Sequence, residues 1–333
     1  MKKILLSLML LCCALAGKAQ TTTDVVKAVL QHGDQVSVFN GGNAFVQAMN
    51  AAVDGDVITL SNGYFTPTPI TKSVSIYGAG YENDAETGTA VSCINGSFFI
   101  GVQGDTLCNV HFEGLYLNSN VTAGYSNSGI KNLTFEKCRL QQALSMAGYN
   151  ENLTFKQCLL YSGLARGGEY KNMLISNCIV LGQVSGYTEN GETLVDHSIC
   201  AGNRYSGNNG RGVTWTNCVF TYNLNNNVCG PYSVVKNCLK RGNANFNDGT
   251  TTENIYNVGD ISQVFADAEN GDYSDERTWE LKQPDVWIGT DGTQIGIHGG
   301  IGWNKVPRTP VIKTLELNVE GPQLRINYEA EAR

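Results

Sequence analysis

The chain has 333 residues, of which 38 are glycine, and 30 acidic side chains outnumber 23 basic ones. This excess of negative charge excludes the basic footprint that nucleic-acid binding requires, so we expect no nucleic-acid partner. Abundant glycine and recurring Asn-Gly and Asn-Asn pairs favour many short strands joined by tight turns.

Residues 1–19 have the composition of a secretory signal peptide. Two lysines precede an apolar run over residues 4–16, and small residues stand at positions 17 and 19, ahead of the expected cleavage point. The mature chain is predicted to begin at Gln20, and loss of the three leader lysines leaves a net charge of −10. No later segment has 18 consecutive apolar residues, so we expect no membrane span in a protein that is secreted, periplasmic or on the outer cell surface.

A short helix and two strands are predicted near the N-terminus. After a lead-in over residues 20–40, residues 43–52 place apolar side chains on one helical face, and Gly55 can end this helix. Residues 56–60 and 73–78 then have the apolar alternation of short strands.

A period of twenty residues governs the middle of the chain. The unit Asn132-Leu-Thr-Phe-Glu-Lys-Cys138 recurs twenty and forty residues later, and the frame continues through residue 238 without an insertion. A first apolar column consists of Phe135, Phe155, Ile175, Val195, Trp215 and Val235. A second column of small side chains consists of Cys138, Cys158, Cys178, Ser198, Cys218 and Cys238. A third column consists of Leu140, Leu160, Val180, Cys200 and Phe220.

The spacing of these columns predicts a bend inside each unit. The first two columns are three residues apart, whereas side chains on one face of a strand are two apart, so a turn must separate them. The residues at this turn are Lys137, Gln157, Asn177, His197, Asn217 and Asn237. Asparagine tolerates the left-handed backbone region, and its amides can stack in a ladder. Each unit is therefore predicted to form one coil with its apolar faces turned inward, about 4.8 Å from the next.

These residues resemble the pectin-lyase-like superfamily of right-handed parallel β-helices, with the likeness extending over roughly residues 41–303. Families of this superfamily often open with a capping helix before the first strands. The segments at residues 264–273 and 291–300 are similar to the closing coils of many secreted bacterial β-helix proteins. The resemblance implies an all-β solenoid over residues 41–305 but not an activity, because this scaffold serves lyases, hydrolases, epimerases and adhesins alike.

Residues 306–333 are predicted to form a β-hairpin. Alternating apolar residues flank Glu320-Gly321-Pro322. This segment is either a cap over the open end of the helix or the stub of a second module.

Nine cysteines remain after residue 19. Those in the ladder have parallel Cβ vectors and are expected to be free, buried fillers. Cys93, Cys108 and Cys229 lie off the ladder, where a bridge among them stays open. Neither zinc spacing nor a calcium loop is present, so we expect no metal and no cofactor.

Two carboxylates are the main catalytic candidates. Glu169 and Glu189 are twenty residues apart, which makes them neighbours on adjacent coils, and retaining glycosidases place their carboxyl groups about 5 Å apart. The non-catalytic alternative is a solvated turn in which the two carboxylates point apart. Residues that lie near them in the frame and are predicted to bind a sugar are Arg166, Tyr170, Tyr187, Arg204 and Tyr205.

Asp196 and His197 form the alternative catalytic pair. Val195-Asp196-His197 resembles the Trp-Ile-Asp-His element of pectate lyases, but the calcium carboxylates and the arginine segment of that family are missing. His197 equally fits the turn column, where histidine tolerates the left-handed region. His298, in a Gly-Ile-His-Gly segment, is expected to be a turn residue.

Two classes of function follow. The first is a non-catalytic, adhesin-like protein that binds a polysaccharide or surface glycan along the helix flank. The second is a polysaccharide lyase or glycoside hydrolase acting in a groove on the same flank. We favour binding, because each catalytic signature is incomplete and the net negative charge slows the approach of polyuronates.

Overall fold

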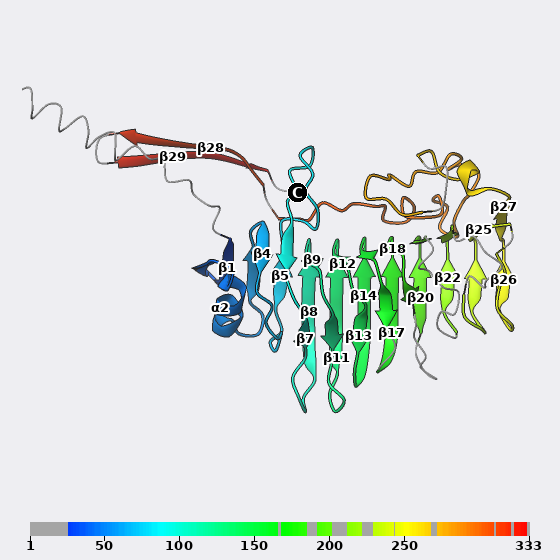
Figure 1. The fold of residues 1–333 in the computed structure, drawn as a ribbon, viewed down its shortest axis with the longest axis horizontal. Coiled ribbons are helices and arrows are strands. Elements are labelled where there is room, and N and C mark those ends of the chain that lie inside the picture. The colour runs from blue at the N-terminus through cyan, green and yellow to red at the C-terminus, as the bar shows by residue number, and fades with distance from the viewer. Residues whose placement is uncertain are drawn as a thin grey trace, which may run out of the picture.

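The computed structural model describes residues 26–165, 168–184, 192–201, 212–221, 229–242, 244–267, 272–309, 311–320 and 323–331. It is a parallel β-helix of about nine coils, with the short helix α2 (Ala44–Ala51) at its N-terminal end (Figure 1). The predicted fold class, all-β with about twenty residues per coil, is confirmed.

Three long sheets run along the stack. The first sheet contains β1 (Lys27–His32), β2 (Gln35–Asn40), β3 (Val57–Leu60), β5 (Ser75–Tyr77), β8 (Leu107–Glu113), β11 (Ile130–Glu136), β14 (Tyr149–Lys156), β17 (Glu169–Ser176), β20 (Thr193–Asp196), β22 (Thr214–Thr216), β24 (Val234–Lys236) and β26 (Thr251–Glu253). The second sheet contains β4 (Gly63–Phe65), β6 (Ser92–Ile94), β9 (Tyr116–Leu117), β12 (Arg139–Leu140), β15 (Leu159–Leu160), β18 (Ile179–Val180), β21 (Ile199–Cys200), β23 (Val219–Phe220), β25 (Leu239–Arg241) and β27 (Tyr256–Val258). The third sheet contains β7 (Phe98–Ile100), β10 (Val121–Ala123), β13 (Leu144–Met146), β16 (Gly163–Ala165) and β19 (Gln183–Val184).

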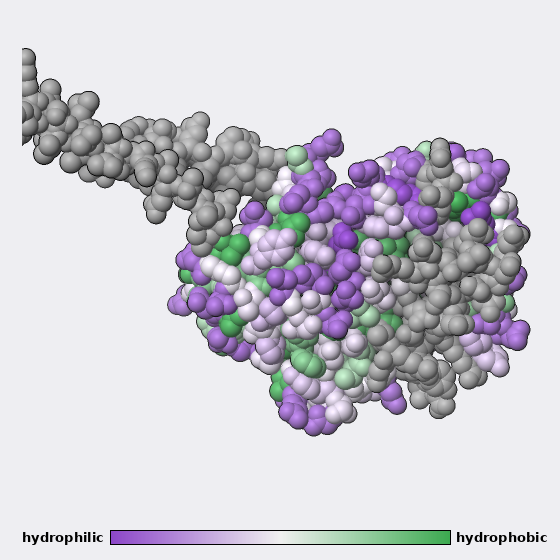
Figure 2. All heavy atoms as spheres, in the orientation of Figure 1, coloured by the Kyte–Doolittle hydropathy of each residue, from purple (hydrophilic) through white to green (hydrophobic). Residues whose placement is uncertain are grey.

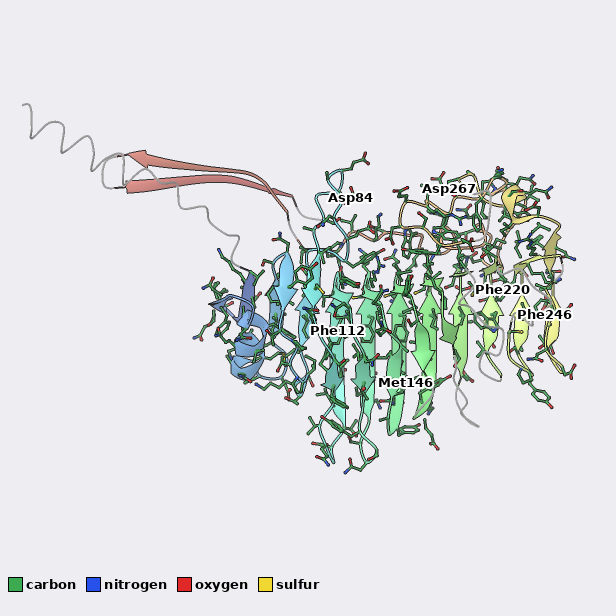
Figure 3. The ribbon with its side chains drawn as sticks, in the orientation of Figure 1. Asp84, Phe112, Met146, Phe220, Phe246 and Asp267 are labelled. Atoms are coloured by element: carbon green, nitrogen blue, oxygen red, sulfur yellow. The ribbon has the colours of Figure 1, made fainter. Side chains whose placement is uncertain are left out.

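The predicted columns match the strand register, because residues of one column are paired across adjacent strands. Phe135 pairs with Phe155, Phe155 with Ile175, and the series continues to Val235. Because each residue lies opposite its counterpart twenty positions away, the rings stack, with centroids 5.4 Å apart for Phe135 and Phe155. Figure 3 labels one core side chain from each sheet, Phe112 of β8, Phe220 of β23 and Met146 of β13, and all three are buried.

The turn between the first and second sheets is left-handed, as the spacing predicts. Every residue of the turn column has a positive φ, from 42° at His197 to 56° at Asn217. A residue in this conformation reverses the alternation of faces, so the side chains three positions apart both enter the core.

The amide ladder, by contrast, forms in a different column from the one predicted. It consists of Asn109, Asn132, Asn152 and Asn172, which lie within the first-sheet strands and also have positive φ. The amide nitrogens of Asn132, Asn152 and Asn172 each donate to the amide oxygen of the preceding coil at 2.8–3.0 Å. The turn column makes one such link, from Asn254 to Asn237 at 3.3 Å, because most of its side chains bond to another segment.

That segment is the C-terminal strap, residues 261–309 without 268–271. Coiling stops at β27 rather than continuing to residue 305, and the chain runs back along the stack, as the orange ribbon in Figure 1 shows. The strap covers an apolar column on the outer face of the second sheet, formed by Leu159, Ile179, Ile199, Val219 and Leu239. It contributes Phe265, Trp279 and Ile295, among others, to this second core.

Polar side chains of the turn column anchor the strap. Gln157 donates to the carbonyl of Gly302 at 2.8 Å, and Asn177 donates to the carbonyls of Ile297 and Gly299 at 2.8 and 2.7 Å. The strap is thus hydrogen-bonded coil by coil to the corner of the solenoid.

Antiparallel hairpins lie at both chain ends. β1 and β2 extend the first sheet beyond β3, so residues 27–40 belong to the solenoid, and α2 packs Phe45 and Met49 into the core. β28 (Val311–Glu320) and β29 (Gln323–Glu331) pair antiparallel, as the C-terminal alternation predicts. In Figure 1 this hairpin extends past the N-terminal end of the stack.

The nine cysteines in the described residues are all free, which confirms the filler interpretation and excludes the bridge left open among Cys93, Cys108 and Cys229. Burial raises the pKa of Cys138, Cys158 and Cys218.

We therefore expect a thiol reagent to modify Cys108, the one described thiol that is not buried, in the native protein and the other eight only after unfolding. Titration without reductant in the presence and absence of denaturant measures this; oxidised ladder thiols contradict it.

Truncation of a stacked ring tests the core. Phe155→Ala is expected to lower the free energy of unfolding by about 3–5 kcal/mol, because Phe155 is fully buried between coils. Denaturant unfolding gives the value, and Tyr149→Ala, on the same strand but exposed, serves as the control and is expected to change it by less than about 1 kcal/mol.

Candidate functional site

Glu169 lies on the outer edge of the first sheet. It is the first residue of β17, is exposed, and pairs in register with Tyr149, whose side chain is 51% exposed. An aromatic ring and a carboxylate therefore stand side by side on adjacent coils. Glu189 and the other predicted flank residues Arg166, Tyr187, Arg204 and Tyr205 lie outside the described residues. The paired-carboxylate hypothesis thus remains a prediction.

Tyr170 does not belong to this exposed set. It follows Glu169 in the same strand, so it points to the opposite face and is buried. Its hydroxyl lies 2.8 Å from Oγ1 of Thr193, and burial raises its pKa. The prediction that Tyr170 binds a sugar is corrected, because its ring packs in the core.

A shallow hollow of about 690 Å³ lies on the outer face of the first sheet. It extends across the strands β14, β17, β20 and β22. The lining residues are Asn152, Leu153, Thr154, Asn172, Met173, Leu174, Glu192, Thr193, Leu194, Gly212 and Thr214. Two amides of the ladder and outward hydroxyls alternate here with aliphatic surface, including Leu194, which is 37% exposed. Glu192 is the one titratable residue in this lining.

Sequence reasoning missed this hollow because its residues carry no catalytic motif. The available signal was the outward column next to the predicted core, in which threonine at 154 and 214 gives way to leucine at 174 and 194. An exposed leucine alone is ordinary, but Leu194 beside the partly exposed Leu174 and the ladder amides forms a surface of mixed polarity.

Asp196 and His197 hold the strap. The His197 ring is 1% exposed; its Nδ1 lies 2.9 Å from Asp196 Oδ2, and its Nε2 lies 3.1 Å from Oγ1 of Thr293. Asp291 of the strap is 3.5 Å from the same nitrogen. A Cβ atom at position 299 would lie only 2.4 Å from this ring, so the strap backbone approaches the imidazole this closely because residue 299 is glycine. Both imidazole nitrogens are therefore engaged, which leaves neither for a substrate.

The Asp196 carboxylate is fixed by the same network. Its Oδ1 accepts from Thr216 at 2.6 Å and from Asn217 at 2.9 Å. Burial by itself raises the pKa of Asp196, but hydrogen bonds from His197 and Thr216 outweigh burial and lower it. His298 also serves the strap, since its Nε2 lies 2.7 Å from the carbonyl oxygen of Thr278.

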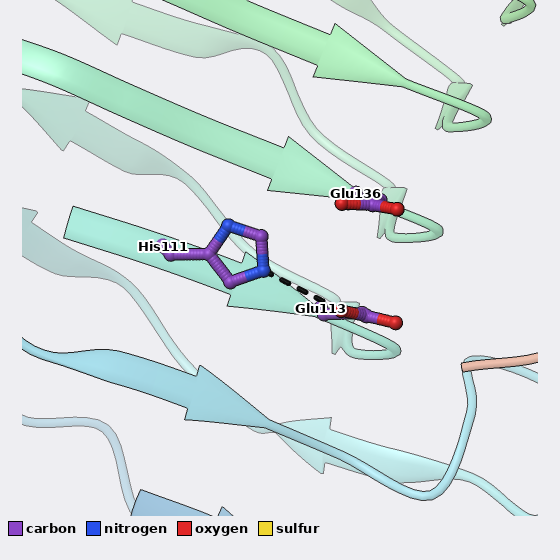
Figure 4. Close-up of side chains that lie close together, drawn as sticks. All are labelled: His111, Glu113 and Glu136. Carbon is purple, nitrogen blue, oxygen red and sulfur yellow. Dashed lines mark ion pairs between the residues drawn. The ribbon is translucent and has the colours of Figure 1, made fainter. Parts of the chain in front are cut away.

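A further cluster of titratable groups lies at the C-terminal end of the strap, and Figure 4 shows its histidine and two glutamates. His111, Glu113 and Glu136 lie at the ends of β8 and β11 with ligand atoms within 4.8 Å of one another, the one such group found among the described residues. The Arg308 guanidinium lies 2.7 and 2.9 Å from Glu113 and 3.1 Å from Glu136. Lys137 adds a second cation 4.0 Å from Glu113. Two cations thus balance two carboxylates, and the Arg308 guanidinium bridges both of them.

Comparisons with protein-family models, curated proteins and solved structures found no match. Within the part of the chain that the structure describes, no helix has the length and apolar content to cross a membrane.

The Glu113–Arg308 contact predicts a pH-dependent latch. Burial by itself raises the pKa of Glu113, but the neighbouring His111 ring at 3.5 Å and hydrogen bonds from Arg308 outweigh it and lower the pKa from 4.5 to about 2. The folded-state pKa is depressed, so this contribution to stability is present above pH 4.5 and is lost as the pH falls towards 2.

Arg308→Ala is expected to lower the free energy of unfolding by on the order of 2–3 kcal/mol at pH 7, less than for a fully buried pair because Arg308 is half exposed. The loss should shrink below pH 4, as Glu113 protonates in the variant. Denaturant unfolding at pH 7 and pH 3 measures both values, and Lys305→Ala, which removes a surface pair with Glu82, is the control. An equal loss at the two pH values contradicts the latch.

Proposed function

We propose that this protein binds a polysaccharide or surface glycan, without catalysis, on the outer face of its first sheet. The observation that carries the proposal is the hollow of about 690 Å³ and its lining of amides, hydroxyls and aliphatic side chains. Amides and hydroxyls match the hydrogen-bonding groups of a sugar, and exposed aliphatic surface matches its C–H faces. The exposed ring of Tyr149, three residues before the lining residue Asn152 on β14, offers a stacking platform on the same strand.

The chemistry of the described residues favours binding over bond cleavage. Glycoside hydrolysis ordinarily uses two carboxylates about 5–10 Å apart. Glu192 is the one carboxylate in the described lining, and Asp196 and His197 are committed to the strap. The alternative, a polysaccharide lyase or glycoside hydrolase, depends on Glu169 acting together with Glu189.

The surface agrees with a soluble receptor for a hydrophilic ligand. Figure 2 shows a face on which hydrophilic and weakly polar residues predominate and hydrophobic residues occur as separate spots. The predicted signal peptide at residues 1–19 and the resemblance of the columns to pectin-lyase-like proteins further support a secreted or cell-surface, adhesin-like role.

Glycan retention tests the proposal. Against a panel of neutral and acidic polysaccharides, Tyr149→Ala and Leu194→Asp are each expected to weaken binding about tenfold, because each removes contact surface worth about 1.4 kcal/mol. Tyr64→Ala is the matched control, since Tyr64 is 63% exposed but lies on the second sheet. Affinity electrophoresis or calorimetry gives the constants; unchanged retention in both site variants places the ligand elsewhere.

The same panel separates binding from catalysis. We expect no release of reducing ends and no absorbance from unsaturated uronates. Turnover that is lost in Glu169→Gln, or in the double change with Glu189→Gln, would establish the enzyme alternative instead.

A further inference from the structure

The N-terminal end of the solenoid presents an open strand edge. β2 is the outermost strand of the first sheet, and among the described strands it pairs only with β1. In an antiparallel strand, every second residue directs its backbone N–H and C=O away from the partner. β2 therefore offers a row of groups ready to pair with another strand.

The side chains of β2 do not protect this edge. Its sequence, QVSVFN, contains no charge and no proline, and its register with β1 is continuous. Val36 and Val38 are 62% and 54% exposed, and Val29, opposite Val38 in β1, is only half buried. Soluble proteins ordinarily guard such edges with lysine, proline or a bulge. The edge at the other end of the sheet, β26, has three residues and includes the charged Glu253.

We propose that β2 pairs antiparallel with β2 of a second copy of this chain, which joins two solenoids at their N-terminal ends. Antiparallel pairing of identical strands has two-fold symmetry, so one patch serves both copies. With the axis at Ser37, Val36 of one copy lies opposite Val38 of the other, and β-branched pairs of this kind stabilise adjacent strands. Neither strand brings a charge that would repel its copy.

The C-terminal hairpin is a second observation at the same end. In Figure 1 it extends beyond β1 and α2, at the end of the stack where β2 lies. Its register pairs Leu315 with Tyr328, Leu317 with Ile326 and Val319 with Leu324. A lone two-stranded sheet is at best marginally stable in water, and a second copy provides a surface that can cover it.

Sedimentation velocity of the purified protein across a wide concentration range tests the pairing. We expect a monomer–dimer equilibrium whose dissociation constant rises at least about tenfold in the double variant Val36→Lys with Val38→Lys, because like charges then lie directly opposite. Both side chains are exposed, so circular dichroism and the melting temperature, measured at a concentration where both proteins are monomeric, should stay unchanged. Val286→Lys, which alters an equally exposed valine on the strap, is the matched control and should associate normally.

A charge-complemented mixture identifies the partner strand. The double variant Val36→Glu with Val38→Glu should also be monomeric alone, and mixing it with the double lysine variant should restore a dimer that contains one copy of each. A wild-type protein that stays monomeric at all concentrations overturns the proposal. So does a dimer that the lysine variant leaves intact, or a mixture that fails to associate.

Discussion

The structure depends on one backbone constraint, a left-handed residue between the first and second sheets of each coil. Holding a non-glycine residue there costs on the order of 1 kcal/mol, and the six residues of the turn column repeat that cost. The conformation persists because it puts two large columns into one core, with Phe155 on one side of the bend and Cys158 on the other. It also leaves the turn side chain at the corner, where Gln157 and Asn177 bond the strap. The same column thus shapes the coil and fixes the segment that covers it.

The strap that covers the second sheet explains why polar residues of catalytic type have structural roles in this protein. From β15 to β23 the second sheet is apolar on both faces, so the fold is complete only when the strap lies over this outer column. Burying the strap's backbone requires hydrogen-bond partners, and buried polar groups are costly when unpaired. Asp196, His197 and Glu113 supply these partners, each with bonds to the strap or to its anchors.

The fold was predictable because its determinants repeat locally. A spacing of twenty residues with an odd step inside each unit is enough to infer coils, inward columns and a left-handed turn. The strap was not, because its contacts join residues as far apart as Glu113 and Arg308 and leave no periodic trace. One signal was present: Leu159-Leu160, Ile179-Val180 and Val219-Phe220 are apolar at successive positions, and a two-residue strand of this kind is buried on both faces.

The candidate site was predictable only in part, because successive side chains along a strand point to opposite faces of the sheet. Glu169 is exposed at the start of β17, whereas Tyr170, predicted beside it as a ligand residue, lies one position further along the strand and points inward. The amide ladder was assigned to the turn because asparagine is frequent there, but the ladder also needs side chains free of other partners. Asn132, Asn152 and Asn172 meet that condition on the exposed face, and Asn177 beneath the strap does not.

The arrangement of covered and open faces limits the kind of ligand that fits. The strap covers the second sheet from β15 to β25, so beside these coils a large partner reaches the solenoid through the first and third sheets. On the first sheet, the hollow crosses four strands at about 4.8 Å each, so it is roughly 15 Å long and offers an amide, a hydroxyl or a leucine at each step. A surface that repeats its chemistry at a short, fixed interval binds best a ligand that also repeats. Because the groups rise from a stacked, hydrogen-bonded backbone, little ordering is needed on binding, and each added ligand unit contributes nearly its full contact energy. An extended polymer therefore gains from the periodicity in a way that a globular partner or a single small molecule does not.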